Sequence, residues 1–339
     1  MRTKQKRPRQ AKGSANWIYL LIIAFFFLVL SWVYLSQPEW SAAILLIPGW
    51  MWLFPGLIAA SWFMFTPLAN KKKARSQCFA SLLLFMVVAV PEPVSLVLGW
   101  GRQAYSMVKA PTHSVEIVSI NCAGGSQDAA RYALLRSPEI LLLQESPGKD
   151  DINKVAREFA GDDKATAWGL DASVIAKGKP VGDPVTGTFY TALKVDTPNL
   201  GEVWAVSVRL LTPSIDVMFP NPQAFKVQRE NREIRREQMR ELAELVRKLK
   251  QDDVPVIVGG DFNTPAYDRI LRDNLEGLND AFIRTGRGHG NTIETETPLH
   301  RIDMIWLSRD LKAIKTVAVV NPHSDHRMVA AGVAAIVGD

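Results

Sequence analysis

The chain has 339 residues, enough for a large hydrophobic core, and its net charge of +6 at first suggests an anionic partner. The charge is unevenly distributed, because residues 1–100 carry ten lysines or arginines and two acids, which leaves −2 for the remaining 239 residues. A mildly acidic domain excludes a global attraction for nucleic acid, although a local basic groove stays open, and two cysteines exclude a disulfide framework.

The first hundred residues predict a membrane domain. A basic tail over residues 1–16 precedes an uncharged run over 17–36, which has the roughly twenty residues needed to cross a bilayer. Apolar runs over 41–65 and 78–100 predict two further spans, with a basic loop at 71–75 between them. Prolines interrupt both runs, so whether the last one spans fully stays open. Three core helices of a soluble protein are the alternative, but they require a far larger surrounding domain.

The two basic clusters predict the topology of this membrane domain. Lysine and arginine are costly to move through a bilayer, so both clusters should stay cytoplasmic. Three crossings of the cell membrane, which is the inner membrane where there are two, then place everything after residue 100 on the extracytoplasmic side. A linker over 101–113 leads to a soluble domain over 114–339. We therefore expect a multi-pass membrane protein with an extracytoplasmic catalytic domain.

Hydrophobic periodicity in residues 114–339 predicts alternating strands and helices, which is typical of an α/β domain. A β-branched strand over 254–258 should end at Gly259 and Gly260, leaving polar side chains at its carboxyl end. Helices are expected over 128–136 and, as an amphipathic surface helix, over 229–251. The other predicted strands are 114–120, 140–143, 173–176, 189–195, 203–210, 304–307, 313–319 and 328–337.

Polar side chains follow five of the predicted strands. Each alone has an ordinary explanation as a turn residue or a solvated strand end. Together they are acids, amides and a histidine at strand ends, and such groups hold Mg²⁺ or phosphate. The set is Asn121, Glu145, Asp261, Asn263, Asp303, Asp325 and His326.

Four motifs in this order resemble the endonuclease/exonuclease/phosphatase superfamily, which includes DNase I, apurinic endonucleases, neutral sphingomyelinases and inositol-polyphosphate 5-phosphatases. Any one motif is weak evidence, but four in order are specific. The resemblance covers about residues 114–337 and implies a two-sheet α/β sandwich of the DNase I type. The motifs are Leu142-Leu143-Gln144-Glu145, Gly259-Gly260-Asp261-Phe262-Asn263-Thr264, Arg301-Ile302-Asp303 and Ser324-Asp325-His326.

The resemblance implies a site for Mg²⁺ or Mn²⁺. Glu145 resembles the principal metal carboxylate, with Asn121 beside it and Asp325 completing the metal shell. Hard oxygen ligands of this kind suit a divalent ion, which neutralises the charge of phosphoryl oxygens and of the leaving group.

The resemblance also implies the catalytic groups. Asp261 resembles the residue that orients or deprotonates the attacking water, and Asn263 the phosphate-binding amide. His326 resembles the histidine that contacts the phosphoryl group, with Asp303 as its carboxylate partner. A carboxylate beside histidine raises the imidazole pKa, which favours the charged donor.

One position departs from the family pattern. Many members carry a further histidine after the strand that here includes residues 206–210, and this chain has Arg209 there. Arginine cannot act as a general acid near neutral pH, but it can clamp a phosphate with two hydrogen bonds. The alternative is that Arg209 only pairs with an acid on the sheet surface. The leaving-group chemistry and the substrate therefore stay open.

These features together predict a membrane-anchored, Mg²⁺-dependent phosphoesterase. It would hydrolyse phosphate ester or pyrophosphate bonds by in-line attack of water. The membrane domain, the mild acidity and an apolar stretch over 211–225 favour a phosphorylated membrane lipid or a lipid-linked substrate. One alternative is a membrane-tethered extracytoplasmic endonuclease or exonuclease acting on nucleic acid. Another is a non-catalytic binding protein with a vestigial site.

Overall fold

The computed structural model describes residues 16–55, 58, 61, 72–89, 114–213 and 221–336. The chain divides into two compact units, Met1–Pro93 and Val94–Asp339, and each is described by itself. The predicted basic tail over residues 1–16, except Asn16, and the predicted linker over 101–113 lie outside the described residues.

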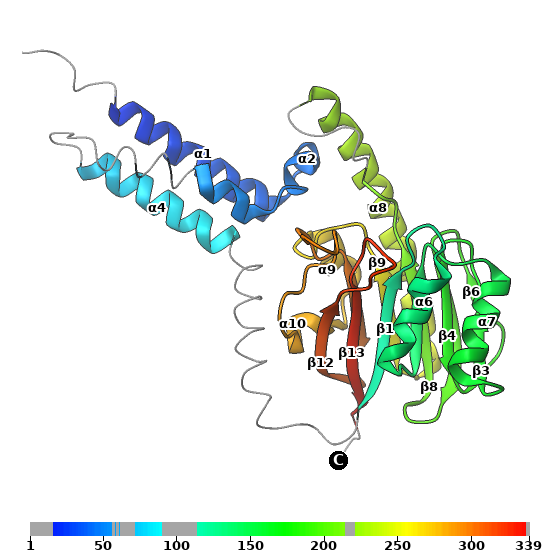
Figure 1. The fold of residues 1–339 in the computed structure, drawn as a ribbon. Helices are drawn as coiled ribbons and strands as arrows, with labels where there is room; N and C mark the ends of the chain where they lie inside the picture. Colours follow the sequence, from blue (N-terminus) through cyan, green and yellow to red (C-terminus); the bar gives the residue numbers. More distant parts are fainter. Residues whose placement is uncertain are drawn as a thin grey trace, which may run out of the picture. The chain divides into compact units, whose positions relative to one another are not determined.

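The amino-terminal unit is helical. Helix α1 (Asn16–Ser36) contains Ile18–Ser36, a segment long and apolar enough to cross a membrane, and no other described helix passes the same test (Figure 1). Its length and its place near the amino terminus suit a membrane anchor or a signal sequence. Helix α4 (Lys72–Ala89) packs against it, with the rings of Phe27 and Phe85 5.3 Å apart.

The predicted three-helix anchor is not supported. The described start of the 41–65 run forms short helical turns instead of one span, because Pro48 lacks an amide hydrogen and begins a new turn. These turns are η1 (Glu39–Ser41), α2 (Ala42–Leu45) and η2 (Gly49–Trp52). In place of the 78–100 span, the apolar part of α4 is only Ser76–Val87. Most of residues 56–71 and all of 90–100 lie outside the described residues.

Two β-sheets form the centre of the second unit (Figure 1). The first has the order β12 (Leu311–Val319), β13 (Met328–Ala335), β1 (Val115–Asn121), β2 (Ile140–Gln144), β4 (Ala172–Lys177) and β3 (Lys164–Ala167). The second has the order β10 (Leu278–Asp280), β11 (Asp303–Ser308), β9 (Val256–Asp261), β8 (Gly201–Arg209), β7 (Tyr190–Thr197) and β5 (Lys179–Pro180), with β6 (Val185–Thr186) paired to β7.

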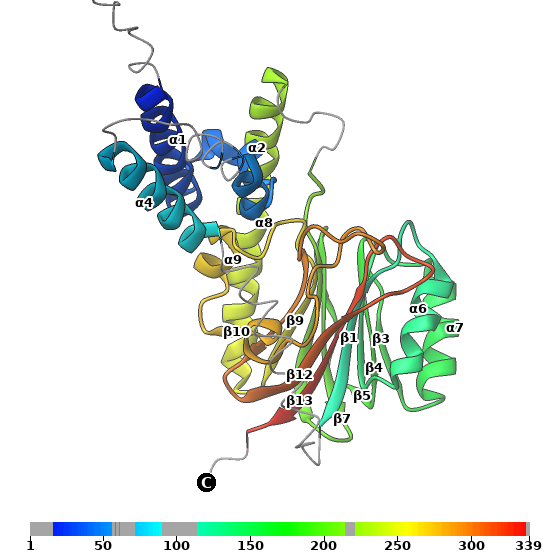
Figure 2. The same cartoon turned by 60° about the vertical axis from the view of Figure 1, so that its left-hand side comes forward.

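The sheets pack face to face around a core that includes Leu142, Ala205 and Ile257. Helices cover both outer faces, so the predicted two-sheet α/β sandwich is confirmed (Figure 2). The first sheet is covered by α6 (Gln127–Ala133), followed by η3 (Leu134–Arg136), and by α7 (Lys149–Ala160). The second is covered by α8 (Pro222–Leu249), followed by η4 (Lys250–Asp252), and by α9 (Arg269–Asn274); α10 (Ala281–Thr285) follows β10.

Strand direction gathers the candidate site at one edge of the sandwich. Strands β1 and β2 are parallel and end side by side, with Asn121 opposite Gln144. Strands β8 and β9 are also parallel, and they end with Arg209 opposite Asp261. The antiparallel strand β11 begins at the same edge, because its first residue, Asp303, pairs with Asp261.

The two glycines of β9 lie inside the strand rather than ending it as predicted. Strand β9 continues through Asp261 because backbone pairing with its neighbours persists across Gly259 and Gly260. Glycine is required here by close approach: a Cβ on Gly260 would lie 1.9 Å from the carbonyl oxygen of Val208. A Cβ on Gly259 would lie 2.6 Å from a methyl carbon of Leu142 in the other sheet. Gly259 therefore lets the two sheets approach each other beneath the site, and Gly260 lets β9 pair closely with β8.

Candidate active site

The side chain of Asn121 lies at the centre of the site and is fully buried at the end of β1. Its amide nitrogen donates to Glu145 Oε1 at 3.1 Å and to Asp261 Oδ2 at 3.0 Å. Its carbonyl oxygen accepts from the amide of Ala123 at 2.9 Å, which fixes the orientation of the carboxamide. Asn121 therefore holds two carboxylates, one from each sheet, in a fixed relation.

Glu145 follows β2 with a left-handed backbone (φ 44°), a conformation that turns the chain sharply where the strand ends. Its carboxylate accepts from the amide of Gly124 at 2.6 Å and from Arg209 Nη2 at 2.9 Å. Burial opposes ionisation, but the hydrogen bonds from Asn121 and Gly124 and the charge of Arg209 outweigh it and lower the pKa of Glu145. Glu145 is thus a carboxylate at neutral pH.

Arg209, at the end of β8, lies between two acids of the site. Its Nη2 contacts Glu145, and its Nη1 lies 3.3 Å from Asp171 Oδ1. Its buried Nε has no hydrogen-bond partner among the described residues. Arg209 therefore pairs with acids, as the alternative interpretation expected, and one of these acids is the predicted metal carboxylate. Its predicted role in binding phosphate stays a prediction.

Asp261 and Asn263 are buried together where β9 ends. Asp261 accepts from the backbone amide of Asn263 at 2.9 Å and from its side-chain amide at 3.0 Å. The same side-chain amide also donates to the carbonyl oxygen of Leu210 at 2.8 Å. Both hydrogens of the Asn263 amide therefore point inward, so its predicted role in binding phosphate stays a prediction.

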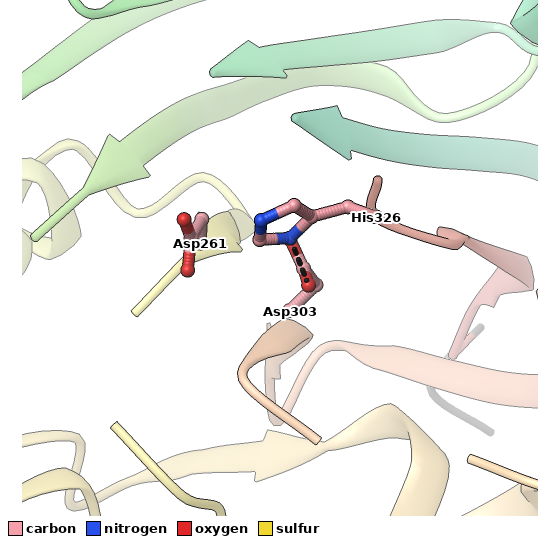
Figure 3. Close-up of side chains that lie close together, drawn as sticks. All are labelled: Asp261, Asp303 and His326. Carbon is pink, nitrogen blue, oxygen red and sulfur yellow. Dashed lines mark hydrogen bonds and ion pairs between the residues drawn. The ribbon is translucent and has the colours of Figure 1, made fainter. Parts of the chain in front are cut away.

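His326 and Asp303 form a buried pair that faces Asp261. His326 Nδ1 lies 2.9 Å from Asp303 Oδ2, and Figure 3 shows the opposite edge of the imidazole ring turned toward Asp261. The amide of Asp303 donates to Thr292 Oγ1 at 3.2 Å, which holds the start of β11 in place. Among the described residues, Asp303 Oδ1 is buried without a hydrogen-bond partner.

The electrostatics of this group favour proton transfer chemistry. Burial and then the charge of Asp303 raise the pKa of Asp261 to about 6. Burial alone would lower the pKa of His326, but the charges of Asp303 and Asp261 raise it to about 10. At neutral pH the raised pKa keeps the His326 ring protonated, and the ring lies between Asp303 and Asp261. The raised pKa of Asp261 makes it a better proton acceptor than an ordinary aspartate.

Asp325 follows Ser324, whose hydroxyl donates to the backbone carbonyl oxygen of Asn121 at 2.7 Å. The side chain of Asp325 is exposed, and its carboxylate makes no hydrogen bond or ion pair with the described residues, although its charge also raises the pKa of His326. Its role as a metal ligand stays a prediction. A different set, Asp261, Asp303 and His326, has ligand atoms within 4.8 Å of one another. A metal ion bound by this set would have to displace the proton that the raised pKa of His326 favours.

Asp171 and Thr292 belong to the site but were not predicted. Asp171 precedes β4, and the antiparallel pairing of β4 with β2 sets Ala172 opposite Gln144. In the sequence Asp171 is only an acid at the start of a strand, and this position does not indicate a site residue until the neighbouring strand is known. Thr292 lies in the loop before β11, and its hydroxyl accepts from the backbone amides of Ile302 and Asp303.

The endonuclease/exonuclease/phosphatase family model matches residues 118–326, a range that contains every residue of this constellation. The chain belongs to this family. The family covers nucleases and phosphatases, both of which break phosphoester bonds, so membership places the chain among phosphoester hydrolases. Comparison with curated proteins gives no match.

Solved structures of low sequence identity share the fold. An endonuclease/exonuclease/phosphatase from Beutenbergia cavernae is 17% identical with a TM-score of 0.50, and the match covers 66% of this chain and 72% of that one. A functionally unknown conserved protein from Enterococcus faecalis is 12% identical with a TM-score of 0.51, covering 65% of this chain and 100% of that one. At this identity the likeness shows the fold of the family and nothing about the substrate.

We expect His326 to remain protonated at about pH 8, where an ordinary imidazole with a pKa near 6.5 is neutral. Because the folded-state pKa is raised, the charged pair contributes stability below about pH 6.5, and this contribution is lost as the pH rises through about 10. Nitrogen-15 NMR of the five histidines gives the measurement, with His326→Gln identifying the signal. Asp303→Asn should lower the measured pKa. A neutral His326 ring at about pH 8 in the unaltered chain would contradict the assignment.

Proposed function

We propose that this family member is a Mg²⁺-dependent phosphoesterase that acts on phosphate ester or pyrophosphate bonds of a membrane lipid or lipid-linked substrate. The observation that carries the catalytic part is the buried carboxylate of Asp261 facing a charged His326, with the ionised Glu145 held beside it by Asn121. A base, a cationic donor and a site for positive charge are the groups that hydrolysis of a phosphoester requires.

Each residue of the site has a separate proposed role. Asp261 accepts a proton from water that attacks phosphorus, and its raised pKa suits a base near neutral pH. Its two amide partners, Asn121 and Asn263, hold the carboxylate in place during this transfer. His326 donates a hydrogen bond from its charged ring to a phosphoryl oxygen, and Asp303 fixes the ring through Nδ1. Arg209 supplies a fixed positive charge for the phosphate or the leaving group.

A divalent cation fits beside Glu145. The donor set there is hard oxygen, Glu145 is ionised, and its side chain is 27% exposed, so an ion can reach it. Arg209 also contacts this carboxylate, so a bound cation would share Glu145 with the guanidinium. When bound, Mg²⁺ would neutralise phosphoryl oxygens and acidify nearby water. Mn²⁺ has similar ligand preferences and is the alternative.

The apolar helix α1 supports a membrane location for the substrate. Residues 1–12 carry six lysines or arginines, which should stay cytoplasmic, so a single crossing by α1 carries the following chain out of the cytoplasm. Two additional spans would give the same orientation. A catalytic domain anchored in this way meets lipid phosphates at the membrane surface.

The orientation predicts the outcome of a reporter fusion. A reporter that is active only outside the cytoplasm, fused after Asp339, should give a signal that disappears when residues 17–36 are deleted. A cytoplasmic reporter at the same position serves as the reciprocal control. Activity of only the cytoplasmic reporter would contradict the proposed location.

Turnover should depend on Asp261. With Mg²⁺, the purified full chain is expected to release phosphate from a polyprenyl pyrophosphate or a phospholipid, and Asp261→Ala should reduce the rate by about 10²–10⁴, as expected for loss of a general base. His326→Ala should show a comparable loss with little change in folding. Plasmid DNA is the competing substrate, and nicking of DNA without lipid turnover would favour a tethered nuclease. Absence of metal-dependent turnover of every substrate would favour a vestigial site.

Metal affinity should depend on Glu145. We expect Glu145→Gln to weaken Mn²⁺ binding by about 10–100-fold, measured by electron paramagnetic resonance, because an amide replaces the ionised oxygen ligand. High Mg²⁺ should then restore part of the activity. Glu158→Gln is the matched control, since that residue pairs with Arg131 on the surface of the domain. Equal Mn²⁺ affinity in both variants would remove Glu145 from the metal site.

A further inference from the structure

The loop Trp168–Asp171 lies next to Glu145, although the loop is distant from Glu145 in the sequence and belongs to none of the four motifs. The loop joins β3 to β4, and β4 runs antiparallel to β2, so its start at Ala172 pairs with Gln144. The turn before β4 is thereby placed beside the turn after β2. Asp171 completes the connection, because its carboxylate contacts Arg209, which contacts Glu145.

Several contacts fix the backbone of this loop. Trp168 Nε1 donates to the carbonyl oxygen of Pro147 at 3.2 Å. The amide of Gly169 donates to Ser173 Oγ at 3.2 Å, and that hydroxyl lies 2.6 Å from Ser146 Oγ. Gly169 has no room for a side chain, since a Cβ would lie 2.2 Å from Thr191 Oγ1. The loop is therefore tied both to the turn that carries Glu145 and to the sheet behind it.

This fixed loop presents apolar side chains to solvent. Leu170 is 77% exposed and Trp168 is 39% exposed, although their neighbours Ala167, Gly169 and Ala172 are buried. Folding gains little from these two side chains, because apolar area stabilises a protein only when it leaves water. The loop carries one acid and no base, which disfavours contact with a polyanion such as nucleic acid.

We propose that Trp168 and Leu170 form the subsite for the hydrocarbon part of the substrate, next to the place where Arg209, beside Glu145, receives its phosphate. This inference rests on the proposed function and specifies its substrate class as a phosphate or pyrophosphate that carries an alkyl, acyl or isoprenoid chain. The chain of contacts from Leu170 through Asp171 and Arg209 to Glu145 sets the apolar surface immediately beside the phosphate position. The first carbons after the phosphate then cover Leu170 and one face of Trp168.

The test measures binding without turnover. The full chain in phosphatidylcholine nanodiscs is titrated calorimetrically with ethyl phosphonate and with octyl phosphonate, which are not hydrolysed. Octyl phosphonate is expected to bind about tenfold more tightly, as burial of a few methylene groups predicts. Leu170→Gln should reduce this preference to within about threefold, with most of the loss of affinity falling on octyl phosphonate. Partitioning into the lipid is common to all variants and cancels from the comparison.

Leu135→Gln is the matched control. Leu135 is 74% exposed and precedes β2, at the opposite end of that strand from Glu145, so its replacement should leave the octyl preference intact. An unchanged preference in Leu170→Gln would overturn the inference. So would tighter binding of thymidine 5′-phosphonate than of octyl phosphonate, lost in Trp168→Leu, because the loop would then stack a base.

The same variants separate this inference from the proposed function. Phosphate release from ethyl and octyl diphosphate by the unaltered chain tests hydrolysis directly. Chain-length preference in binding without any release would retain the subsite and reject the hydrolase. Release of phosphate from both compounds, with an octyl preference that Leu170→Gln does not change, would retain the hydrolase and reject the subsite.

Discussion

The site depends on polar contacts that cross from one sheet to the other. Asn121 belongs to the first sheet and donates to Asp261 of the second, while His326, just before β13 of the first sheet, pairs with Asp303 of the second. A buried carboxylate without partners costs several kcal/mol, so the donor that the opposite sheet supplies stabilises each of these acids, although Asp261 also accepts from Asn263. The site therefore forms only when the two sheets pack at the correct spacing, and a change in this spacing would disrupt both the packing and the site.

These contacts also explain the unequal character of the three carboxylates. Glu145 lies at the rim with two donors and a guanidinium, so it stays ionised and accessible to a cation. Asp261 is buried near a second acid, and its pKa rises toward neutrality. Asp303 is committed to the imidazole of His326 through one oxygen. One fold thus produces a charge-binding carboxylate, a proton acceptor and an orienting group from chemically similar side chains.

The sequence predicted the polar groups at strand ends because parallel strands must bring their carboxyl ends together, as β1 with β2 and β8 with β9 show. It did not predict the neighbours that depend on strand order, such as Asp171, which reaches Arg209 only because β4 pairs with β2. Gly259 and Gly260 were expected to end a strand, since close approach to Val208 and Leu142 cannot be inferred from local composition.

Helix α8 begins at Pro222, seven residues before the expected start at Arg229, because the Asn221 cap and Pro222 begin it within a stretch that resembles an apolar loop. In the amino-terminal unit, counting apolar residues could not distinguish one continuous helix from short turns interrupted at Pro48.

Arg209 contacts both Glu145, the proposed metal carboxylate, and Asp171, which belongs to the proposed hydrocarbon-binding loop. A histidine at this position could exchange a proton with a leaving group, whereas a guanidinium stays charged and can only attract. The structure holds that charge between Glu145 and Asp171, so a phosphate that approaches must compete with Asp171 for the guanidinium. A leaving group that needs no proton, such as the phosphate released from a pyrophosphate, suits a fixed charge better than an alkoxide does. Under the proposed function, a pyrophosphate would therefore suit Arg209 better than a phosphate ester would.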